Sequence, residues 1–249
     1  MSGHSKWSSI KHRKAAADAK RGKMFTKLAR AITVAAREGG GDPDANPTLA
    51  TAVQKARDFS MPKDNIQRAI DRGTGEGSAA DAIERVVYEG YGPGGAAILV
   101  ETLTDNRNRT GSDVRHAFET HGGSLGEPGS VAWQFEQRGV VLVDGDRYEE
   151  DDLLPAIDAG AEDVEADDDV LKVTSAPGSL SAVREALESA GVEIQSAELA
   201  MEPKAVVEVG DAEAGQLLRL LDALDDHEDV GEVHANFDVP ADVLQRVAG

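Results

Sequence analysis

The sequence predicts a multidomain α+β protein that consists of an N-terminal helical bundle, a split α+β domain and an inserted ferredoxin-like domain. Three observations predict this class. Apolar residues recur with helical spacing up to about residue 72, strand-like segments joined by turns begin after residue 78, and the expected element order over 139–202 is βαββαβ, the ferredoxin-like arrangement. We expect domains over 1–75, over 79–136 together with 204–249, and over 137–203.

The N-terminal part reads as a basic arm followed by short helices. Leu28, Ile32 and Ala36 recur at the spacing of a buried helix face. Asn46-Pro47 is typical of a helix N-cap followed by a first-turn proline. The expected elements are a helix over 15–20 that ends at Gly22, a helix over 23–38, a helix that follows the Asn46-Pro47 cap, and a helix that opens at Pro62 and closes at Gly73.

The remaining elements alternate between strands and helices. The middle group and the C-terminal group are each too small to bury a sheet face, so we expect them to pair around the insertion. The expected strands are 83–89, 96–103, 131–135, 140–143, 163–166, 170–174, 194–201, 205–209 and 230–239. The expected helices are one capped by Asp105-Asn106, then 149–159, 180–190 and one around 217–224.

Composition excludes several classes of site. The 249 residues include no cysteine, which excludes disulfides, thiolate metal sites and cysteine nucleophiles and suits a reducing compartment. No apolar run approaches the roughly 20 residues that span a bilayer, and the first residues do not resemble a secretory signal. No nucleophile, base and oxyanion site can be assembled from the motifs. We therefore expect a cytoplasmic protein with no cofactor, no metal, no membrane partner and no enzymatic activity.

Charge is distributed unevenly along the chain. The protein carries 46 acidic and 26 basic residues, a net charge of −20, yet residues 1–40 hold ten Lys and Arg against two acids. Residues 41–72 are neutral on balance, so residues 73–249 carry a net charge of −28. An acidic protein with one basic end is typical of polyanion binding, and nucleic acid is the commonest such partner.

The basic residues fall into an arm and a helix stripe. Segment 3–14 is basic and rich in small residues, and Trp7 is an aromatic side chain able to stack on a base. The alternative for the arm is a tail whose Trp7 packs on the helical bundle, and the alternative for the stripe is a solvated helix face. The candidate nucleic-acid contacts are Lys6, Trp7, Lys11, Arg13 and Lys14 in the arm and Lys23, Lys27 and Arg30 in the stripe.

The turn from Thr104 to Thr110 is unusually polar for a strand-to-helix connection. Its helix N-terminus and the cations Arg107 and Arg109 are suited to hold phosphate or RNA. Helix capping combined with a network at a domain interface explains the same residues equally well. We therefore keep Arg107 and Arg109 as secondary candidates for nucleic-acid contact.

Long motifs of the chain resemble the YebC/PmpR family, which includes the mitochondrial translational activator of cytochrome oxidase. The matching segments include GHSKWSSIKHRK at 3–14, MPKDNIQRAIDRG at 61–73 and YEGYGPGGAAILVETLTDNRNRT at 88–110. The resemblance covers essentially the whole chain, by layout more than by motif after residue 139. It implies three domains with a ferredoxin-like insertion, and either a DNA-binding transcriptional regulator or a ribosome-associated factor that helps translation through difficult stretches.

The leading hypothesis is a non-enzymatic regulator of gene expression that binds DNA. The alternative in the same class is a ribosome-associated translation factor that binds ribosomal RNA and relieves stalling. A basic arm and the lack of a clear major-groove recognition helix favour RNA slightly. An alternative of another class is an adaptor that binds a protein through the acidic α+β domains. We expect a monomer or a weak homo-oligomer.

Overall fold

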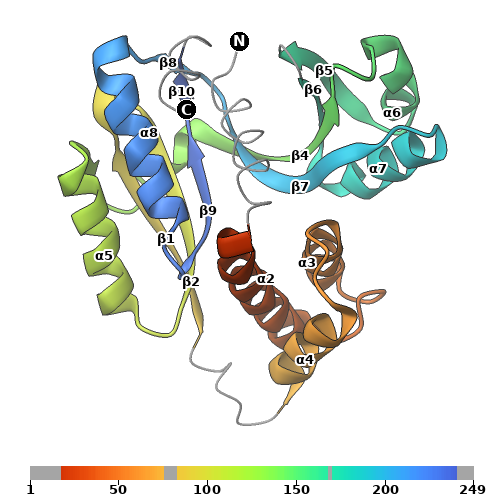
Figure 1. The fold of residues 1–249 in the computed structure, drawn as a ribbon, viewed down its shortest axis with the longest axis horizontal. Coiled ribbons are helices and arrows are strands. Elements are labelled where there is room, and N and C mark those ends of the chain that lie inside the picture. Colours follow the sequence, from red (N-terminus) through yellow and green to blue (C-terminus); the bar gives the residue numbers. More distant parts are fainter. Residues whose placement is uncertain (1–17, 76–82, 168–169, 240–249) are drawn as a thin grey trace.

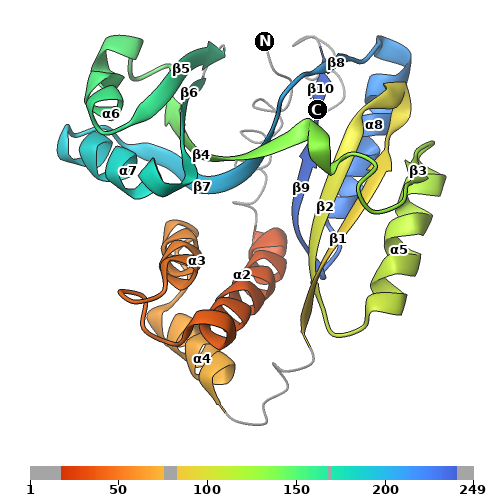
Figure 2. The same cartoon turned by 180° about the vertical axis from the view of Figure 1, so that it is seen from behind.

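The computed structural model describes residues 18–75, 83–167 and 170–239 (Figure 1). It is a multidomain α+β fold with an N-terminal helical region and two four-stranded sheets whose neighbouring strands are antiparallel. The long strands β4 (Phe135–Asp144) and β7 (Ile194–Pro203) run from one sheet-containing lobe to the other, and the helical lobe lies beside both (Figures 1 and 2).

The helical lobe consists of α2 (Asp18–Gly39), α3 (Pro47–Asp58) and α4 (Lys63–Thr74). The predicted N-cap is confirmed, because the Asn46 side chain accepts a hydrogen bond from the backbone N–H of Leu49 at 3.1 Å. The predicted helix break at Gly22 is wrong. Gly22 lies on an exposed helix face with nothing within 4 Å of the position of a Cβ, and α2 continues through it.

Close contact between α2 and α4 depends on a glycine. A Cβ atom at Gly73 would lie 2.3 Å from the backbone oxygen of Thr33 and 2.8 Å from the Cβ of Ala36. The buried hydroxyl of Thr33 donates to the backbone oxygen of Ala69 at 3.0 Å, which joins the same two helices. Gly73 therefore serves helix packing and lies inside α4, which ends at Thr74, one residue after the end that the sequence predicted.

The first sheet has the strand order β3-β1-β2-β9. Helices α5 and α8 cover one face (Figures 1 and 2), and the core beneath them includes Ile98, Phe118 and Leu217. In this order β2 pairs with β9, a strand that lies far downstream in the chain. The elements are β1 (Glu84–Tyr91), β2 (Ala97–Thr104), α5 (Arg107–Thr120), β3 (Ser124–Leu125), α8 (Asp211–Asp225) and β9 (Val230–Ala235), with a two-stranded pair of β8 (Val207–Glu208) and β10 (Phe237–Asp238) nearby.

The second sheet has the strand order β5-β6-β4-β7. Helices α6 and α7 pack against it around a core that includes Val141, Leu153 and Leu187. The predicted strands over 163–166 and 170–174 and the predicted helix over 180–190 are confirmed. The elements between β4 and β7 are a 3₁₀ turn (Glu150–Leu153), α6 (Leu154–Asp158), β5 (Ala161–Asp167), β6 (Val170–Ser175) and α7 (Leu180–Ser189).

The predicted strand over 230–239 is divided into β9 and β10, which belong to different sheets. Two other predicted elements also differ from the structure. Residues 131–135 are not a separate strand, because Ala132–Gln134 form a 3₁₀ turn and Phe135 begins β4. The backbone N–H groups of Val131 and Ala132 donate to the carboxylate of Glu89, so they are not available to a strand ladder. The predicted helix over 149–159 begins as a 3₁₀ turn because Pro155, which has no N–H, cannot continue an α-helical hydrogen-bond pattern from that turn.

We predict that Gly73→Ala lowers the free energy of unfolding by about 2 kcal/mol, because the added methyl group meets the α2 backbone and forces the helices apart. Gly22→Ala is the matched control in α2. It meets no neighbour and should raise the free energy of unfolding by roughly 0.5–1 kcal/mol, since alanine loses less backbone entropy than glycine in a helix. Urea unfolding measures both values. Equal effects of the two substitutions would contradict this account of Gly73.

Candidate functional site

The structure describes part of the predicted nucleic-acid surface. The arm residues Lys6, Trp7, Lys11, Arg13 and Lys14 lie outside the described residues. The other candidates lie on α2, where the stripe is located, and at the start of α5, where Arg107 and Arg109 are located. Both places face the turn between α8 and β9.

The three stripe cations contact the end of α8 and the turn that follows it. Lys23 Nζ donates to the backbone oxygen of Asp226 at 3.3 Å, and Lys27 Nζ donates to the backbone oxygen of Asp225. Arg30 donates to the backbone oxygen of Glu228 at 3.2 Å. Free carbonyl groups at a helix C-terminus attract cations because they carry the negative end of the helix dipole. Only 9% of the Lys27 side chain is exposed, so a phosphate cannot reach this cation without displacing α8.

The carboxylate of Asp229 joins the stripe to α5. Its side chain is 0% exposed. Arg30 from α2 forms an ion pair with one carboxylate oxygen, and Arg109 Nη2 from α5 lies 2.9 Å from the other. The hydroxyl groups of Thr110 and Thr104 lie 2.7 Å and 3.4 Å from that second oxygen. The structure therefore brings together Arg30 and Arg109, two cations that are separate in the sequence, on one buried acid.

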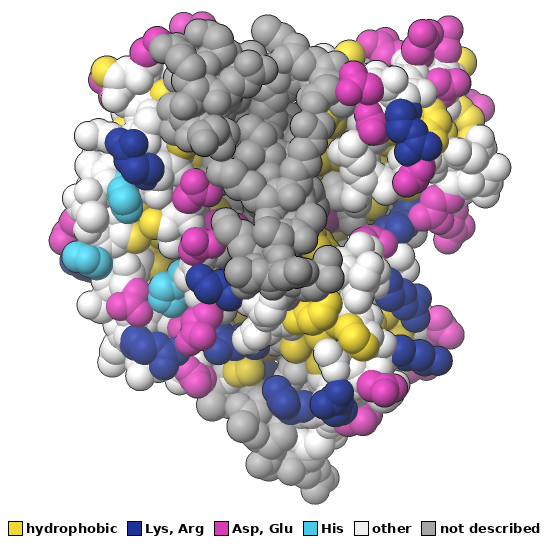
Figure 3. Space-filling model, viewed as in Figure 1, with side chains coloured by type: hydrophobic (Ala, Val, Ile, Leu, Met, Phe, Trp, Pro, Cys, Tyr) yellow, Lys and Arg dark blue, Asp and Glu magenta, His cyan; other side chains and the backbone are white. Residues whose placement is uncertain are grey.

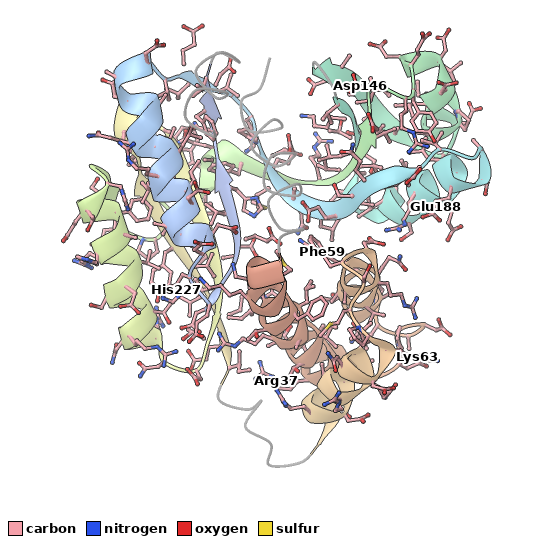
Figure 4. All side chains as sticks on the ribbon, in the orientation of Figure 1. Arg37, Phe59, Lys63, Asp146, Glu188 and His227 are labelled. Atoms are coloured by element: carbon pink, nitrogen blue, oxygen red, sulfur yellow. The ribbon has the colours of Figure 1, made fainter. Side chains whose placement is uncertain are left out.

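The same contacts keep Asp229 ionised. Burial raises the pKa of its carboxyl group, but hydrogen bonds from Arg109, Thr110 and Arg30 outweigh burial and lower the pKa from 3.8 to about 2. His227 also fixes the backbone of Asp229, because its Nδ1 accepts a hydrogen bond from the Asp229 backbone N–H at 3.1 Å. Figure 4 places His227 beside the end of α8 that faces α2. At neutral pH, one buried negative charge thus balances two arginines from two lobes.

The polar turn at 104–110 is explained by this network. Asn106 caps α5 by accepting a hydrogen bond from the Arg109 backbone N–H at 3.1 Å. Thr104 and Thr110 share a buried hydroxyl contact of 2.7 Å beneath Asp229. Arg107 differs from the other candidates. It is exposed, and within the described part of the chain its guanidinium group forms no ion pair.

A second set of ion pairs between lobes was not predicted from the sequence. Lys55 of α3 contacts Glu198 of β7 at 2.5 Å and also Glu232 of β9. Burial alone lowers the pKa of Lys55, but the two carboxylates raise it above its ordinary value. Asp58 pairs with Arg184 of α7 at 3.0 Å. A single sequence carries no signal for these contacts, because each partner is distant in the chain and unremarkable in its local pattern.

The surface outside these contacts is divided by charge. Figure 3 shows Lys and Arg side chains over the helical lobe and a concentration of acidic side chains over the lobe of β4–β7. At the far end of α2, which Figure 4 labels at Arg37, the Arg37 guanidinium donates to the backbone oxygen of Ile83 at 2.8 Å. Among the described residues, no group of three or more His, Asp or Glu side chains is arranged to hold a metal ion. None of the described helices is long and apolar enough to cross a membrane.

We predict that Asp229→Asn lowers the free energy of unfolding by about 3 kcal/mol at pH 7, because two arginines lose a buried counter-charge. Asp105→Asn is the matched control. Asp105 is an exposed partner of the same Arg109, and its loss should cost less than about 1 kcal/mol. Urea unfolding of the three proteins tests the difference, and similar losses for both variants would contradict a structural role for Asp229.

The lowered pKa of Asp229 predicts a pH effect on stability. A carboxyl group whose pKa is lower in the folded state stabilises the fold above its unfolded pKa, and that contribution is lost as pH falls. The wild-type protein should therefore lose about 2 kcal/mol between pH 4 and pH 2 that Asp229→Asn does not lose. Parallel pH profiles of the two proteins would contradict the lowered pKa.

Comparison with known proteins extends over nearly the whole chain. Residues 5–76 match the family described as the TACO1/YebC protein N-terminal domain, and residues 83–237 match the TACO1/YebC second and third domain. A "Probable transcriptional regulatory protein" of Rubrobacter xylanophilus is 60% identical over 250 residues and covers 100% of both chains. One of the same description from Desulfotalea psychrophila is 53% identical over 250 residues, again 100% of both chains.

A solved structure has the same fold. The crystal structure of a conserved hypothetical protein from Aquifex aeolicus is 44% identical and superposes with a TM-score of 0.82, covering 92% of this chain and 94% of that one. The agreement in sequence and the agreement in fold extend over both sheets and the helical lobe. This chain belongs to the TACO1/YebC family.

Proposed function

We propose that this protein is a non-enzymatic regulator of gene expression that binds nucleic acid through its N-terminal arm. The observation that carries the proposal is the charge of residues 1–14, which include four Lys and Arg and no acid in a chain of net charge −20. Such a segment binds a phosphate backbone by releasing condensed counterions. The relatives named as probable transcriptional regulatory proteins support the same class of function.

The contacts of α2 support a division of labour among the predicted residues. We assign direct phosphate contact to Lys6, Lys11, Arg13 and Lys14, and base stacking to Trp7. Arg107, an exposed cation, is a secondary candidate for phosphate contact. Lys23, Lys27, Arg30 and Arg109 already bind acidic groups or carbonyl oxygens of the α+β lobe. In our proposal these four residues hold the lobes together, and Lys27, with only 9% of its side chain exposed, is the least accessible of them to nucleic acid.

The domain organisation is part of the proposal. The sheet has the spatial strand order β5-β6-β4-β7, and along the chain α6 follows β4 and α7 follows β6. This arrangement supports a ferredoxin-like domain over 137–203. Pairing of β2 with β9 supports a domain split into 79–136 and 204–249 around that insertion. Residues 1–75 form the arm and helical domain. In this arrangement the basic arm precedes, in the sequence, the one lobe that is not acidic, and the proposal places the protein in the cytoplasm.

The target is either DNA or ribosomal RNA. A transcriptional regulator is the leading proposal because the relatives bear that name. The described helices offer a specific reason to test RNA as well. Lys23, Lys27 and Arg30 of α2 already bond to the end of α8 and the turn after it, so these cations are not arranged as a recognition helix for a major groove. Crosslinking in cells followed by sequencing of both DNA and RNA distinguishes promoter DNA from ribosomal RNA.

A protein-binding adaptor is a second candidate function. Leu154 and Ile157 lie one turn apart on α6 with more than half of each side chain exposed, beside the exposed acids Glu150, Asp151 and Asp158. An exposed apolar pair within an acidic rim suits a basic partner. The test compares proteins captured by the full chain with those captured by Leu154→Ser/Ile157→Ser. Identical captured proteins would dismiss the adaptor.

We predict that Lys11→Ala/Arg13→Ala/Lys14→Ala weakens nucleic-acid binding and flattens its salt dependence. Removing three phosphate contacts should reduce the slope of log K against log salt by about 2–3 units. Fluorescence anisotropy with labelled DNA and RNA, measured over a range of salt concentrations, gives both quantities.

The matched control removes three exposed cations from other helices, Lys63, Arg115 and Arg219. It changes the net charge by the same amount, so any effect of total charge appears in both variants. The control should retain the wild-type slope. If the arm variant and the control bind alike, the arm is not the nucleic-acid contact.

A further inference from the structure

A buried carboxylate holds the loop between β3 and β4 in one shape. Glu89 of β1 is 7% exposed, and its two oxygens accept hydrogen bonds from the backbone N–H groups of Gly129, Val131 and Ala132 at 2.6, 2.7 and 2.8 Å. Burial raises the pKa of Glu89, but these three bonds lower it below its ordinary value. An ionised side chain therefore fixes the backbone of the loop before any ligand arrives.

The loop presents an aromatic side chain to solvent. Val131 and Phe135 point inward, where they pack with Ala97 and Leu99 on the sheet face opposite α5 and α8. Trp133 lies between them and is 67% exposed. A tryptophan contributes most to folding when its large apolar area is buried, so at this level of exposure Trp133 adds little stability. The loop is thus built to hold this ring outside the core.

A second aromatic ring is fixed to the same point. Trp133 Nε1 and the Tyr91 hydroxyl both donate to the backbone oxygen of Ser130, each at 3.1 Å. Tyr91 is 38% exposed. Because both rings are held by a polar group at the edge, their apolar faces do not have to turn inward to satisfy that group. Two partly exposed rings from β1 and from the loop are therefore anchored next to each other.

A cation stands beside the rings. Lys204 Nζ donates to the backbone oxygen of Trp133 at 2.9 Å, and the Lys204 backbone N–H donates to the backbone oxygen of Gln134 at 2.8 Å. The side chain of Lys204 is exposed. The exposed acids Glu127 and Glu136 flank Trp133 in the sequence. One lysine accompanied by two acids does not create the positive potential that attracts a duplex backbone. Attraction to phosphates alone therefore does not account for binding at this surface.

We propose that Trp133 and Tyr91 form a stacking platform for unpaired bases of a nucleic acid, with Lys204 contacting the adjoining phosphate. This inference rests on the proposed function, since the basic arm supplies the electrostatic attraction. Unpaired bases expose the ring faces that aromatic side chains bind, whereas bases in a duplex are already stacked. The surroundings also favour a base over a protein, because Glu127, Gln134 and Lys204 interrupt the continuous apolar area that a protein interface requires.

Intrinsic fluorescence tests the platform directly. The chain has two tryptophans, Trp7 and Trp133, so Trp7→Phe leaves Trp133 as the sole reporter and serves as the reference for every other variant. Titration with a mixed-sequence single-stranded oligonucleotide should quench the emission of Trp133, and the matched duplex should quench it much less. In the same background, Trp133→Ala should weaken single-strand binding about tenfold without changing the slope of log K against log salt. Trp133→Phe, which keeps a ring, should retain most of the affinity.

The outcomes separate this inference from the proposed function. If the oligonucleotide binds by anisotropy but leaves Trp133 emission unchanged, and Trp133→Ala binds normally, the platform is wrong while the arm proposal stands. That result would assign the exposed rings to a protein partner instead. If the reference protein and the wild type bind no single-stranded or duplex nucleic acid, both proposals fall. Circular dichroism of Trp133→Ala should match the reference, because the substituted side chain is mostly exposed.

Discussion

The buried carboxylate of Asp229 is the interaction on which the arrangement of the lobes depends. It accepts charge-assisted hydrogen bonds from Arg30 of the helical lobe and Arg109 of the α+β lobe. Neither arginine is held in place by a second buried acid among the described contacts, so loss of this carboxylate would leave two partly buried cations facing each other. The capping of α5 and the buried threonine pair around Asp229 serve the same purpose.

This constraint separates two groups of cations that look alike in the sequence. The stripe on α2 has the spacing of a nucleic-acid surface, but the end of α8 and the turn after it already supply its anionic and carbonyl partners. Our proposal therefore assigns nucleic-acid contact to the arm and to Arg107. Glu89 uses the same physical device, a buried carboxylate with several donors, to fix the loop that carries Trp133. The buried carboxylates of Asp229 and Glu89 thus each position the elements around them.

The sequence was most informative where a pattern is local. Helical spacing and the Asn46 cap predicted α3, and alternation with turn signals predicted the hairpin of β1 and β2. Sequence reasoning failed at Gly22 because an exposed glycine is tolerated inside a long helix. It failed over 131–135 because the result there depends on a tertiary contact, in which Glu89 takes the backbone N–H groups of Val131 and Ala132. Asp229 was missed for the same reason. It follows an acidic run and gains its meaning only when α2 and α5 meet around it.

A double-mutant cycle between Arg30 and Asp229 tests the central claim most directly, because it isolates the contact between lobes from the separate effects of each residue. Arg30→Met, Asp229→Asn and the double variant would be unfolded in urea beside the wild type. The account predicts that the two substitutions are strongly non-additive, with a coupling energy of roughly 1.5–3 kcal/mol. Additivity within about 0.5 kcal/mol would contradict it, because Arg30 and Asp229 would then not depend on each other.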